Sequence, residues 1–392
     1  MGFLIGSAYG FGVIMARSFG AGDFKEFRKY FFNSIILSII IGIVFTIVLS
    51  LVNSYLLKLI STPAELFDGA HKFLFILYIG CASSLIYNLF AATLRSIGNS
   101  FTPVLFLLLS VVINAILAYV FVAIFSWGVE GSAVATIIAQ AASALCCYIY
   151  INRKYPQIRL TKQDAVLDIS HMKNLILQGA PMGMQFSFTG IGLIVVQKFL
   201  NGFGTNYIAG YSVGVRIQNI VSYVYVALGT AISTFISQNI GAKRMYRIPK
   251  AVKYTTLITI GCAIFSTIVI RFFGPNFISL FTTAPNEELT HATVTYFNNV
   301  TLAYIPLGLI ILYRSALQGY GFPIIAMMAG IIELINRVVI VIFLTDTFGF
   351  LAICLADSVN WVITAVFLLI VYFIATRSHK NKNKAFYIEP SM

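Results

Sequence analysis

The chain has 392 residues, of which 59% are hydrophobic and only 10% are charged. Soluble domains are about 45–50% apolar and about 25% charged, so a chain this apolar could not cover its surface with polar groups. The composition excludes a water-soluble globular protein and predicts an all-α, polytopic membrane protein. The net charge of +13 would suit a nucleic-acid partner only if the basic residues formed one patch, and they are dispersed.

Eleven stretches of the sequence are long and apolar enough to cross a bilayer as helices. Charged residues or clusters of glycine, proline and asparagine separate them. In chain order they lie near residues 1–20, 33–61, 70–97, 102–125, 130–152, 174–200, 208–239, 252–281, 290–319, 322–345 and 350–376.

Basic residues gather on alternate connections between these predicted spans. Counting along the chain assigns 20 of the 26 Lys and Arg residues to one side, including Arg95 and Arg314, which are placed in loops. By the positive-inside rule, we expect this side and the C-terminus to be cytoplasmic. The sequence thus predicts a multi-pass protein of the plasma membrane, with the lipid bilayer and no nucleic acid as a partner.

Cysteine and histidine positions give no sign of a metal or of catalysis. The five cysteines fall inside apolar stretches, and the four histidines are dispersed at segment ends or in loops. A membrane enzyme that used histidine for metal or acid–base chemistry would bring several together at one depth. The sequence also has no glycine-rich phosphate loop, so we expect neither an enzyme nor a bound metal or cofactor.

An internal repeat relates the two halves of the chain. Several residue pairs recur at a near-constant offset of 219–222 residues, which oily helices would not produce by composition alone. These pairs are Gly20 and Gly241, Ala21 and Ala242, Pro63 and Pro285, Arg95 and Arg314, Pro103 and Pro323, and Gly128 and Gly349.

The repeat predicts two pseudo-symmetric six-helix lobes with a substrate path between them, of which eleven helices are present here. We expect an N-terminal lobe at 1–152, a cytoplasmic linker at 153–173, a C-terminal lobe at 174–376 and a cytoplasmic tail at 377–392. The repeat partner of the span at 174–200 would fall upstream of residue 1. We therefore expect the first helix of the first lobe to be missing.

Motifs in both halves resemble those of the MATE family, the multidrug and toxic compound extrusion transporters. They are SFGAGD at 18–23, LRSIGNSFTP at 94–103, GVEGSAVAT at 128–136, QGAPMGMQ at 178–185, SQNIGAKR at 237–244, YRSALQGYG at 313–321 and GIIELINRV at 330–338. The resemblance implies an exporter that exchanges an organic cation or another amphiphile for H⁺ or Na⁺ by alternating access. Some branches have a carboxylate in the seventh helix where this chain has Thr189, which leaves the coupling ion open.

Charged residues within predicted spans are the candidates for ion coupling, because charges inside a membrane are costly and commonly functional. They are Glu333, Asp357, Arg337 and Arg216, which we expect to lie in one layer and to neutralise one another. Glu333 and Arg337 are four residues apart and share one helix face. Either acid could bind the coupling cation or a proton, or the pairs could be purely structural and join helices.

Polar and aromatic residues are the candidates for the substrate cavity. Stacking and cation–π contacts with tyrosine could hold cationic amphiphiles, although tyrosine is also an ordinary interface anchor. The candidates are Gln185, Thr189, Asn219, Tyr223, Tyr304, Tyr313 and Tyr87. Pro181 and Pro306 lie within predicted spans and are the candidate hinges.

Three functions remain in competition at the level of sequence. The first is a secondary active antiporter that exports cationic or amphiphilic small molecules in exchange for H⁺ or Na⁺. The second is a flippase for lipid-linked oligosaccharides of the same superfamily, which should have a more cationic cavity. The third is a fragment that does not transport. The sequence leaves the natural substrate and the oligomeric state open.

Overall fold

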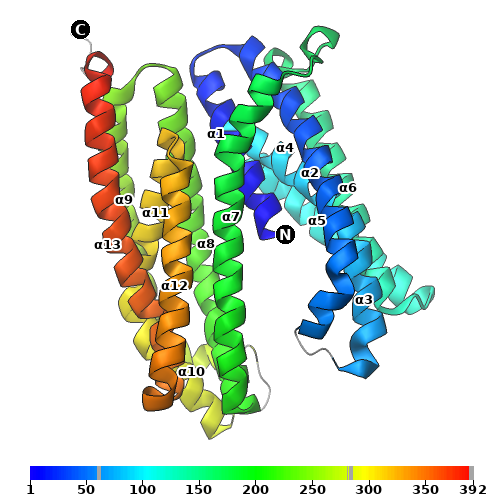
Figure 1. Ribbon diagram of the computed structural model, residues 1–392, viewed down its shortest axis with the longest axis vertical. Helices are drawn as coiled ribbons and strands as arrows, with labels where there is room; N and C mark the ends of the chain where they lie inside the picture. The colour runs from blue at the N-terminus through cyan, green and yellow to red at the C-terminus, as the bar shows by residue number, and fades with distance from the viewer. Residues whose placement is uncertain (60–62, 280, 282–285, 388–392) are drawn as a thin grey trace. The chain divides into compact units, whose positions relative to one another are not determined.

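Long apolar segments fold as helices in this protein, because a helix satisfies all its backbone hydrogen-bonding groups within one segment. The computed structural model describes residues 1–59, 63–279, 281 and 286–387, and Figure 1 shows them as helices joined by short connections. Pro285, which belongs to the repeat, lies outside the described residues. Within the described ranges, ten helices are long and apolar enough to span a membrane, or eleven when one bent pair counts as a span. The predicted all-α, polytopic membrane fold is confirmed.

The chain divides into two units, Met1–Gly183 (unit 1) and Met184–Met392 (unit 2). The division falls inside one continuous helix, whereas the sequence predicts lobes separated by a linker at 153–173, and those boundaries stay a prediction. Each unit is described below by itself.

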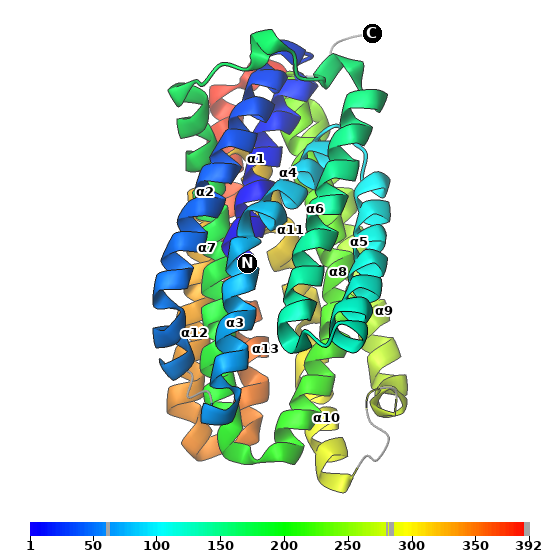
Figure 2. The ribbon, with the colours of Figure 1, turned by 90° about the vertical axis from the view of Figure 1, so that its right-hand side faces the viewer.

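Unit 1 is built from helices of very different lengths. α5 and α6 run side by side, and α4 packs against both α1 and α2 (Figure 2). Its elements are α1 (Gly2–Gly20), α2 (Phe24–Leu59), α3 (Ala64–Ile79), α4 (Cys81–Ser96), α5 (Phe101–Tyr119), a π-helical turn (Val120–Ile124), α6 (Gly128–Lys154), two short 3₁₀ turns (Pro156–Ile158 and Lys162–Asp164) and the first half of α7 (Ile169–Leu200).

Glycines let α1 and α7 approach each other at backbone distance within unit 1. A Cβ atom added to Gly10 would lie 2.5 Å from the Cα of Gly179, and one added to Gly6 would lie 2.5 Å from the carbonyl oxygen of Met182. Real Cβ atoms do not approach backbone so closely, so larger residues would force the helices apart. This face of unit 1 is held by close packing of small residues.

The linker between α6 and α7 is fixed to the first turns of α2. The Arg28 guanidinium donates from Nε to Asp164 at 2.8 Å and from Nη1 to the Gln157 carbonyl at 2.9 Å. Asn33 donates to the Val166 carbonyl at 3.1 Å and accepts from the Asp168 amide at 3.0 Å. Burial alone would raise the pKa of Asp164, but hydrogen bonds from Thr161 and Arg28 outweigh it and lower that pKa.

Unit 2 contains the second half of α7 and six further α-helices. α12 and α13 lie side by side, and α8 packs against both α10 and α11 (Figure 1). The elements are a 3₁₀ turn (Asn201–Phe203), α8 (Thr205–Gly241), a 3₁₀ turn (Met245–Arg247), α9 (Ile248–Ile278), α10 (Glu287–Val300), a 3₁₀ turn (Thr301–Ala303), α11 (Tyr304–Tyr320), α12 (Pro323–Phe348), α13 (Phe350–Lys382) and a last 3₁₀ turn (Lys384–Tyr387).

Two predicted spans are wrong as single straight helices. The segment 70–97 belongs to α3 and α4, which meet at Gly80 with a bend of 46°. The segment 290–319 is interrupted by the 3₁₀ turn at Thr301–Ala303. Side chains compensate the backbone there, since Thr267 donates to the Thr301 carbonyl at 3.0 Å and Arg271 donates to the Asn298 carbonyl at 2.7 Å. Hydropathy detects apolar length and is blind to such breaks.

Candidate functional site

The buried polar side chains of unit 2 come from four helices and face one another in its interior. Two of the helices contribute residues one turn apart, which therefore share a face: Arg314 and Gln318 on α11, and Glu333 and Arg337 on α12. α7 contributes Gln185 and Thr189, and α13 contributes Asp357, Asn360 and Thr364. We call Arg314, Glu333, Arg337 and Asp357 the charged cluster.

Glu333 is held by two partners from two different helices. One carboxylate oxygen accepts from a terminal nitrogen of Arg314. The other lies 3.3 Å from the hydroxyl of Thr189, which is also 3.2 Å from the carbonyl oxygen of Gln185. The side chain of Glu333 is only 5% exposed and that of Arg314 is 11% exposed. Both charges are thus removed from solvent and face each other.

Arg337 and Asp357 form the second ion pair. Arg337 Nε donates to Asp357 Oδ1 at 3.0 Å, and the two side chains are 5% and 4% exposed. Nη1 of Arg337 has no hydrogen-bond partner within the described protein. A Cβ atom added to Gly192 would lie 3.4 Å from Nη1, so glycine on α7 leaves room for the guanidinium. The pair therefore keeps one donor available inside the unit.

Two glutamines and an asparagine extend this polar region along the helices. Gln318 donates from Nε2 to Gln185 Oε1 at 2.8 Å, and both side chains are buried. Asn360 accepts from Thr364 at 3.2 Å and lies 3.4 Å from the amide of Asn336. A hydrogen-bonded polar path therefore leads from Gln318 through Gln185 and Thr189 to Glu333.

The charged cluster is neutral as a whole, because it contains two acids and two arginines. Removing charges from water costs several kcal/mol per ion, and close pairing offsets this cost only while both partners are present. Loss of one charge, by mutation or by protonation, therefore leaves its partner buried without compensation. This makes the cluster responsive to a proton or another cation.

Arg216 is not part of the charged cluster, although the sequence places it in the same layer. It is exposed on α8, next to the buried Ile217, and among the described residues no ion pair joins it to an acid. The helical frame of α8 turns it away from the core of unit 2. Asn219 and Tyr223, one and two turns further along α8, are exposed on the same side.

The charge that replaces it is Arg314, which sequence reasoning assigned to a cytoplasmic loop. That assignment is wrong, because Arg314 lies within α11 and pairs with Glu333. Counting basic residues treats each as solvated and misses one whose partner lies 19 positions away. The signal that could have found it is the spacing of Arg314 and Gln318, two polar residues one turn apart in an otherwise apolar stretch.

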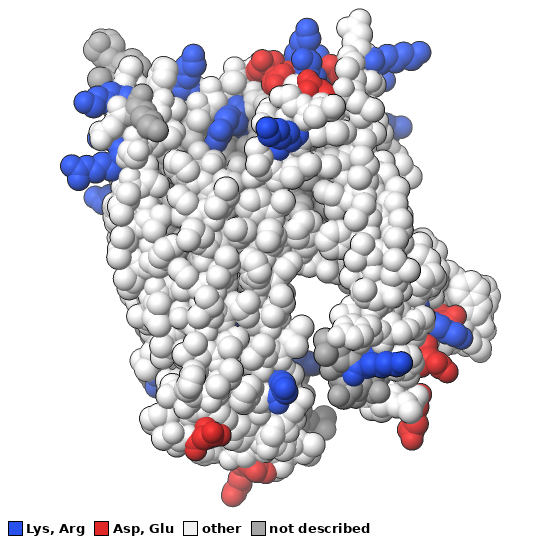
Figure 3. Space-filling view, viewed as in Figure 1, with Lys and Arg blue, Asp and Glu red and all other residues white. Residues whose placement is uncertain are grey.

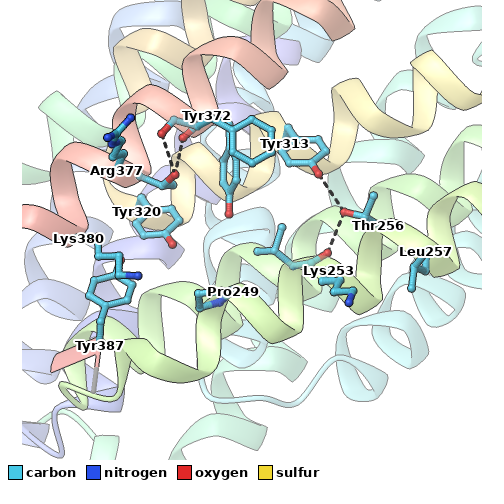
Figure 4. Close-up of a pocket in the computed structure, with 13 residues that line it drawn as sticks. Pro249, Lys253, Thr256, Leu257, Tyr313, Tyr320, Tyr372, Arg377, Lys380 and Tyr387 are labelled. Carbon is cyan, nitrogen blue, oxygen red and sulfur yellow. Dashed lines mark hydrogen bonds between the residues drawn. The ribbon is translucent and has the colours of Figure 1, made fainter. Parts of the chain in front are cut away.

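The predicted tyrosines lie in different surroundings. Tyr304 is fully buried in the core of unit 2, and Tyr87 is buried in unit 1 with its hydroxyl 3.2 Å from the Pro103 carbonyl. Tyr313 lines a cavity of about 650 Å³ in unit 2, where its hydroxyl lies 3.2 Å from that of Thr256 (Figure 4). The structure therefore does not bring these three tyrosines to one site.

The two predicted hinge prolines differ in context. Pro181 lies inside α7, which continues through it from Ile169 to Leu200. Pro306 lies in the first turn of α11, directly after the 3₁₀ turn at Thr301–Ala303. A proline in a first helical turn removes no helical hydrogen bond, so the interruption before α11 precedes Pro306.

Comparison with known proteins gives a consistent answer. The MatE family model matches residues 1–120 and 181–343, which is more than half of the chain. The probable multidrug resistance protein YpnP of Bacillus subtilis is 25% identical over 292 residues, which cover 73% of this chain and 64% of that protein. This chain thus spans just under two thirds of the length of YpnP. The multidrug export protein MepA of Staphylococcus saprophyticus is 23% identical over 96% of this chain and 84% of its own length.

Other relatives and solved structures extend this likeness. The FAD transporter of Shewanella oneidensis is 23% identical over 84% of this chain and 74% of its length. A crystal structure of a MATE protein in the bent conformation superposes with a TM-score of 0.89 and 18% identity, over 98% of this chain and 86% of the other. A Vibrio cholerae MATE transporter, VcmN, gives a TM-score of 0.88 with 19% identity, over 99% and 87% of the two chains.

The structural likeness supports the fold, and the family match assigns the chain. Members of this family are transporters, which confirms that the protein is not an enzyme. The family needs no cofactor. The chain belongs to the MatE family of multidrug efflux transporters.

Proposed function

We propose that this protein is a secondary active antiporter of the plasma membrane, with a cytoplasmic C-terminus, that exports cationic or amphiphilic small molecules by alternating access. The inward-moving ion is H⁺ or Na⁺. The observation that carries the proposal is the pairing of Glu333 with Arg314 inside a transporter fold. Its position between α7, α11 and α12 means that a change of charge alters contacts among three helices at once.

The chemistry of the charged cluster favours a proton over Na⁺. Hard metal cations need several oxygen ligands, and both acids of the cluster already face an arginine. No group of three or more His, Cys, Asp or Glu side chains gathers within the described ranges. Sodium would have to displace a guanidinium, whereas a proton needs only one carboxylate oxygen. Protonation of Glu333 would release Arg314 and free the Thr189 hydroxyl.

The pair of Arg337 and Asp357 has a separate part in this proposal. It joins α12 to α13 and lies one helical turn from Glu333 on α12. Its remaining donor, Arg337 Nη1, offers a place for a water molecule or a substrate oxygen. We assign it the structural role first and a second proton site only if the experiment below requires it.

The proposed substrate contacts are polar groups of unit 2. Gln185 and Thr189 connect directly to Glu333, so a molecule that binds them would sense the charge state of that acid. Asn219 and Tyr223 offer an exposed amide and an exposed ring on α8. The proteins named above as multidrug resistance and export proteins support a drug-like substrate for this chain. A flippase for lipid-linked oligosaccharides is less well supported, because both arginines of the cluster are paired with acids.

Reconstituted vesicles would test the proposal. We expect purified protein in proteoliposomes to move ethidium against its gradient when a pH gradient is imposed, and we expect a Na⁺ gradient alone to be much less effective. Glu333→Gln should abolish coupling, since an amide cannot take up a proton reversibly. Glu130→Gln is the matched control, because it removes a charge from an exposed acid.

A paired variant separates coupling from folding. Glu333→Gln alone leaves Arg314 buried without a partner, so a double variant Arg314→Gln/Glu333→Gln removes both charges, and Arg337→Gln/Asp357→Asn is its counterpart. Loss of coupled transport in the first double variant and its retention in the second would identify Glu333 as the coupling residue. Ion-driven transport that survives in both would refute the proposal, and no transport by the folded wild type would remove the export function altogether.

A further inference from the structure

The cavity lined by Tyr313 carries a second, independent set of features. It lies in unit 2 among α9, α11 and α13 and measures about 650 Å³, within the ~300–1,000 Å³ of small-molecule sites. Figure 4 shows its lining residues converging from these three helices and from the last 3₁₀ turn. They are Pro249, Val252, Lys253, Thr256, Leu257, Tyr313, Tyr320, Tyr372, Phe373, Thr376, Arg377, Lys380 and Tyr387. The charged cluster shares none of them.

The wall of this cavity is a packed group of aromatic rings. The Tyr372 ring lies 4.9 Å from that of Tyr313 and 6.2 Å from that of Tyr320, both edge-on, measured between ring centres. These three tyrosines are at most 6% exposed, so their positions are fixed by the core of unit 2. The cavity is therefore a built feature of the unit.

The charge of the cavity selects its ligand. Three of its lining residues are basic, namely Lys253, Arg377 and Lys380, and all three are exposed. None of the described residues that line it is acidic. A positive rim repels organic cations and favours a phosphate or another anion. Basic side chains also gather at the end of unit 2 where α13 ends, beyond an almost uncharged side (Figure 3).

The depth of the lining residues shows what accompanies the anion. Arg377 and Lys380 lie within the last turn or so of the span Phe350–Asn381, where the chain leaves the apolar layer. Leu257 and Phe373, one turn further into the spans of α9 and α13, are 56% and 62% exposed apolar side chains. The cavity thus crosses the boundary between headgroup and hydrocarbon. A soluble anion would use the rim but would leave this apolar surface uncovered.

We infer that this cavity is a binding site for an anionic glycerophospholipid of the adjacent leaflet. The phosphate lies between Lys253 of α9 and the pair Arg377 and Lys380 of α13, and the upper acyl chains cover Leu257 and Phe373. Basic pockets between membrane helices bind anionic headgroups in this way. The bound lipid would join α9 to α13 at the end of unit 2. Only the identity of the leaflet rests on the proposed orientation.

Lipid binding by the full-length purified protein would test this site. In neutral detergent, we expect dioleoylphosphatidylglycerol to remain bound in native mass spectra and dioleoylphosphatidylcholine to be lost. The triple variant Lys253→Gln/Arg377→Gln/Lys380→Gln should lower the affinity for phosphatidylglycerol by about tenfold or more, since each basic residue near a membrane surface contributes to anionic lipid binding. The matched control, Arg153→Gln/Lys154→Gln/Arg159→Gln in unit 1, removes the same charge and should leave this binding unchanged.

Two further arms distinguish a lipid from a free anion. Leu257→Gln/Phe373→Gln should weaken phosphatidylglycerol binding while all three cations remain, and millimolar inorganic phosphate should not displace the lipid. Equal loss in both triple variants, no preference for phosphatidylglycerol, or full displacement by phosphate would overturn the inference. The assay measures binding without transport, so its outcome is independent of whether the antiporter proposal survives.

Discussion

Units 1 and 2 repeat the same succession of helices but hold their interiors together differently. α2, the bent pair α3 and α4, α5 and α6 recur in order as α9, the interrupted pair α10 and α11, α12 and α13. Unit 2 contains two ion pairs whose side chains are all 11% exposed or less. In the described part of unit 1, the ion pairs lie in the linker, near helix starts or on the surface.

The repeat offset shows what unit 1 has at the corresponding positions. With the offsets of neighbouring repeat pairs, Glu333 corresponds to Ile113, Arg337 to Leu117 and Asp357 to Thr136. Arg314 corresponds to Arg95, whose guanidinium lies 4.9 Å from the centre of the Tyr9 ring. One unit thus forms this helical arrangement with apolar and hydroxyl residues. The acids of unit 2 are therefore not a requirement of the architecture, which supports a functional use for them.

The largest expected effect comes from breaking one ion pair of unit 2. Glu333→Gln leaves the Arg314 charge buried without its partner, and we expect a loss of about 3–5 kcal/mol in the free energy of unfolding. Thermal unfolding of purified protein in detergent measures this loss. Glu130→Gln, an exposed acid of unit 1, should leave the unfolding temperature unchanged. Equal shifts in the two variants would contradict the contrast between the units.

Replacing a whole pair by apolar residues should reverse the sign of the effect. Arg337→Met/Asp357→Leu makes this part of unit 2 resemble unit 1, and removal of both buried charges is expected to be neutral or stabilising by about 1–4 kcal/mol. Each single variant should instead destabilise. A double-mutant cycle of unfolding free energies checks this, and a double variant that is less stable than both single variants would show that the pair is required for the fold.

Unit 1 should be more sensitive to an added methyl group where α1 meets α7. Gly10→Ala places a Cβ atom 2.5 Å from the Cα of Gly179, so we expect a loss of about 1–3 kcal/mol through forced backbone shifts. Gly190→Ala, in the same α7 but with nothing within 4 Å of the added atom, should be neutral or stabilising by up to about 1 kcal/mol. Unfolding curves of the two variants provide the comparison, which fails if both behave alike.

The smallest effect concerns acid conditions and the linker of unit 1. Because the pKa of Asp164 is lowered in the folded protein, its ionised form stabilises the linker above the ordinary carboxyl pKa of about 4. That stabilisation is lost as the pH falls below this value and Asp164 becomes protonated. Amide hydrogen exchange at residues 161–168 should therefore accelerate on acidification, beyond the intrinsic change in exchange rate. Asp164→Asn should exchange faster already at neutral pH and respond less to acid, whereas an unchanged pH response would assign the effect to other groups.

Much of the fold could be predicted from the sequence, because apolar length and the positions of charges locate helices that must satisfy their own backbone. The breaks at Gly80 and at Thr301–Ala303 could not, since both depend on contacts from other helices. At the first of these, Thr46 of α2 donates to the Tyr78 carbonyl at 2.6 Å. Such contacts leave no trace in a hydropathy profile.

The candidate site was only partly predictable for a related reason. Helical spacing correctly places Glu333 and Arg337 on one face, yet their hydrogen-bonded partners come from α11 and α13. Which arginine faces which acid depends on how four helices pack, and this is why Arg216 was included and Arg314 was left in a loop. Polar pairs one turn apart within an apolar stretch are the more reliable signal.

The attachment of the linker to α2 also matters for the chain as a polymer. A free stretch of some 14 residues, such as 155–168, would let its ends wander over roughly 20 Å as a random coil. Instead, Arg28 and Asn33 fix it at three places, at Gln157, Asp164 and the segment from Val166 to Asp168. The linker behaves as a strap rather than a leash, and the starting point and direction of α7 are set by unit 1 alone.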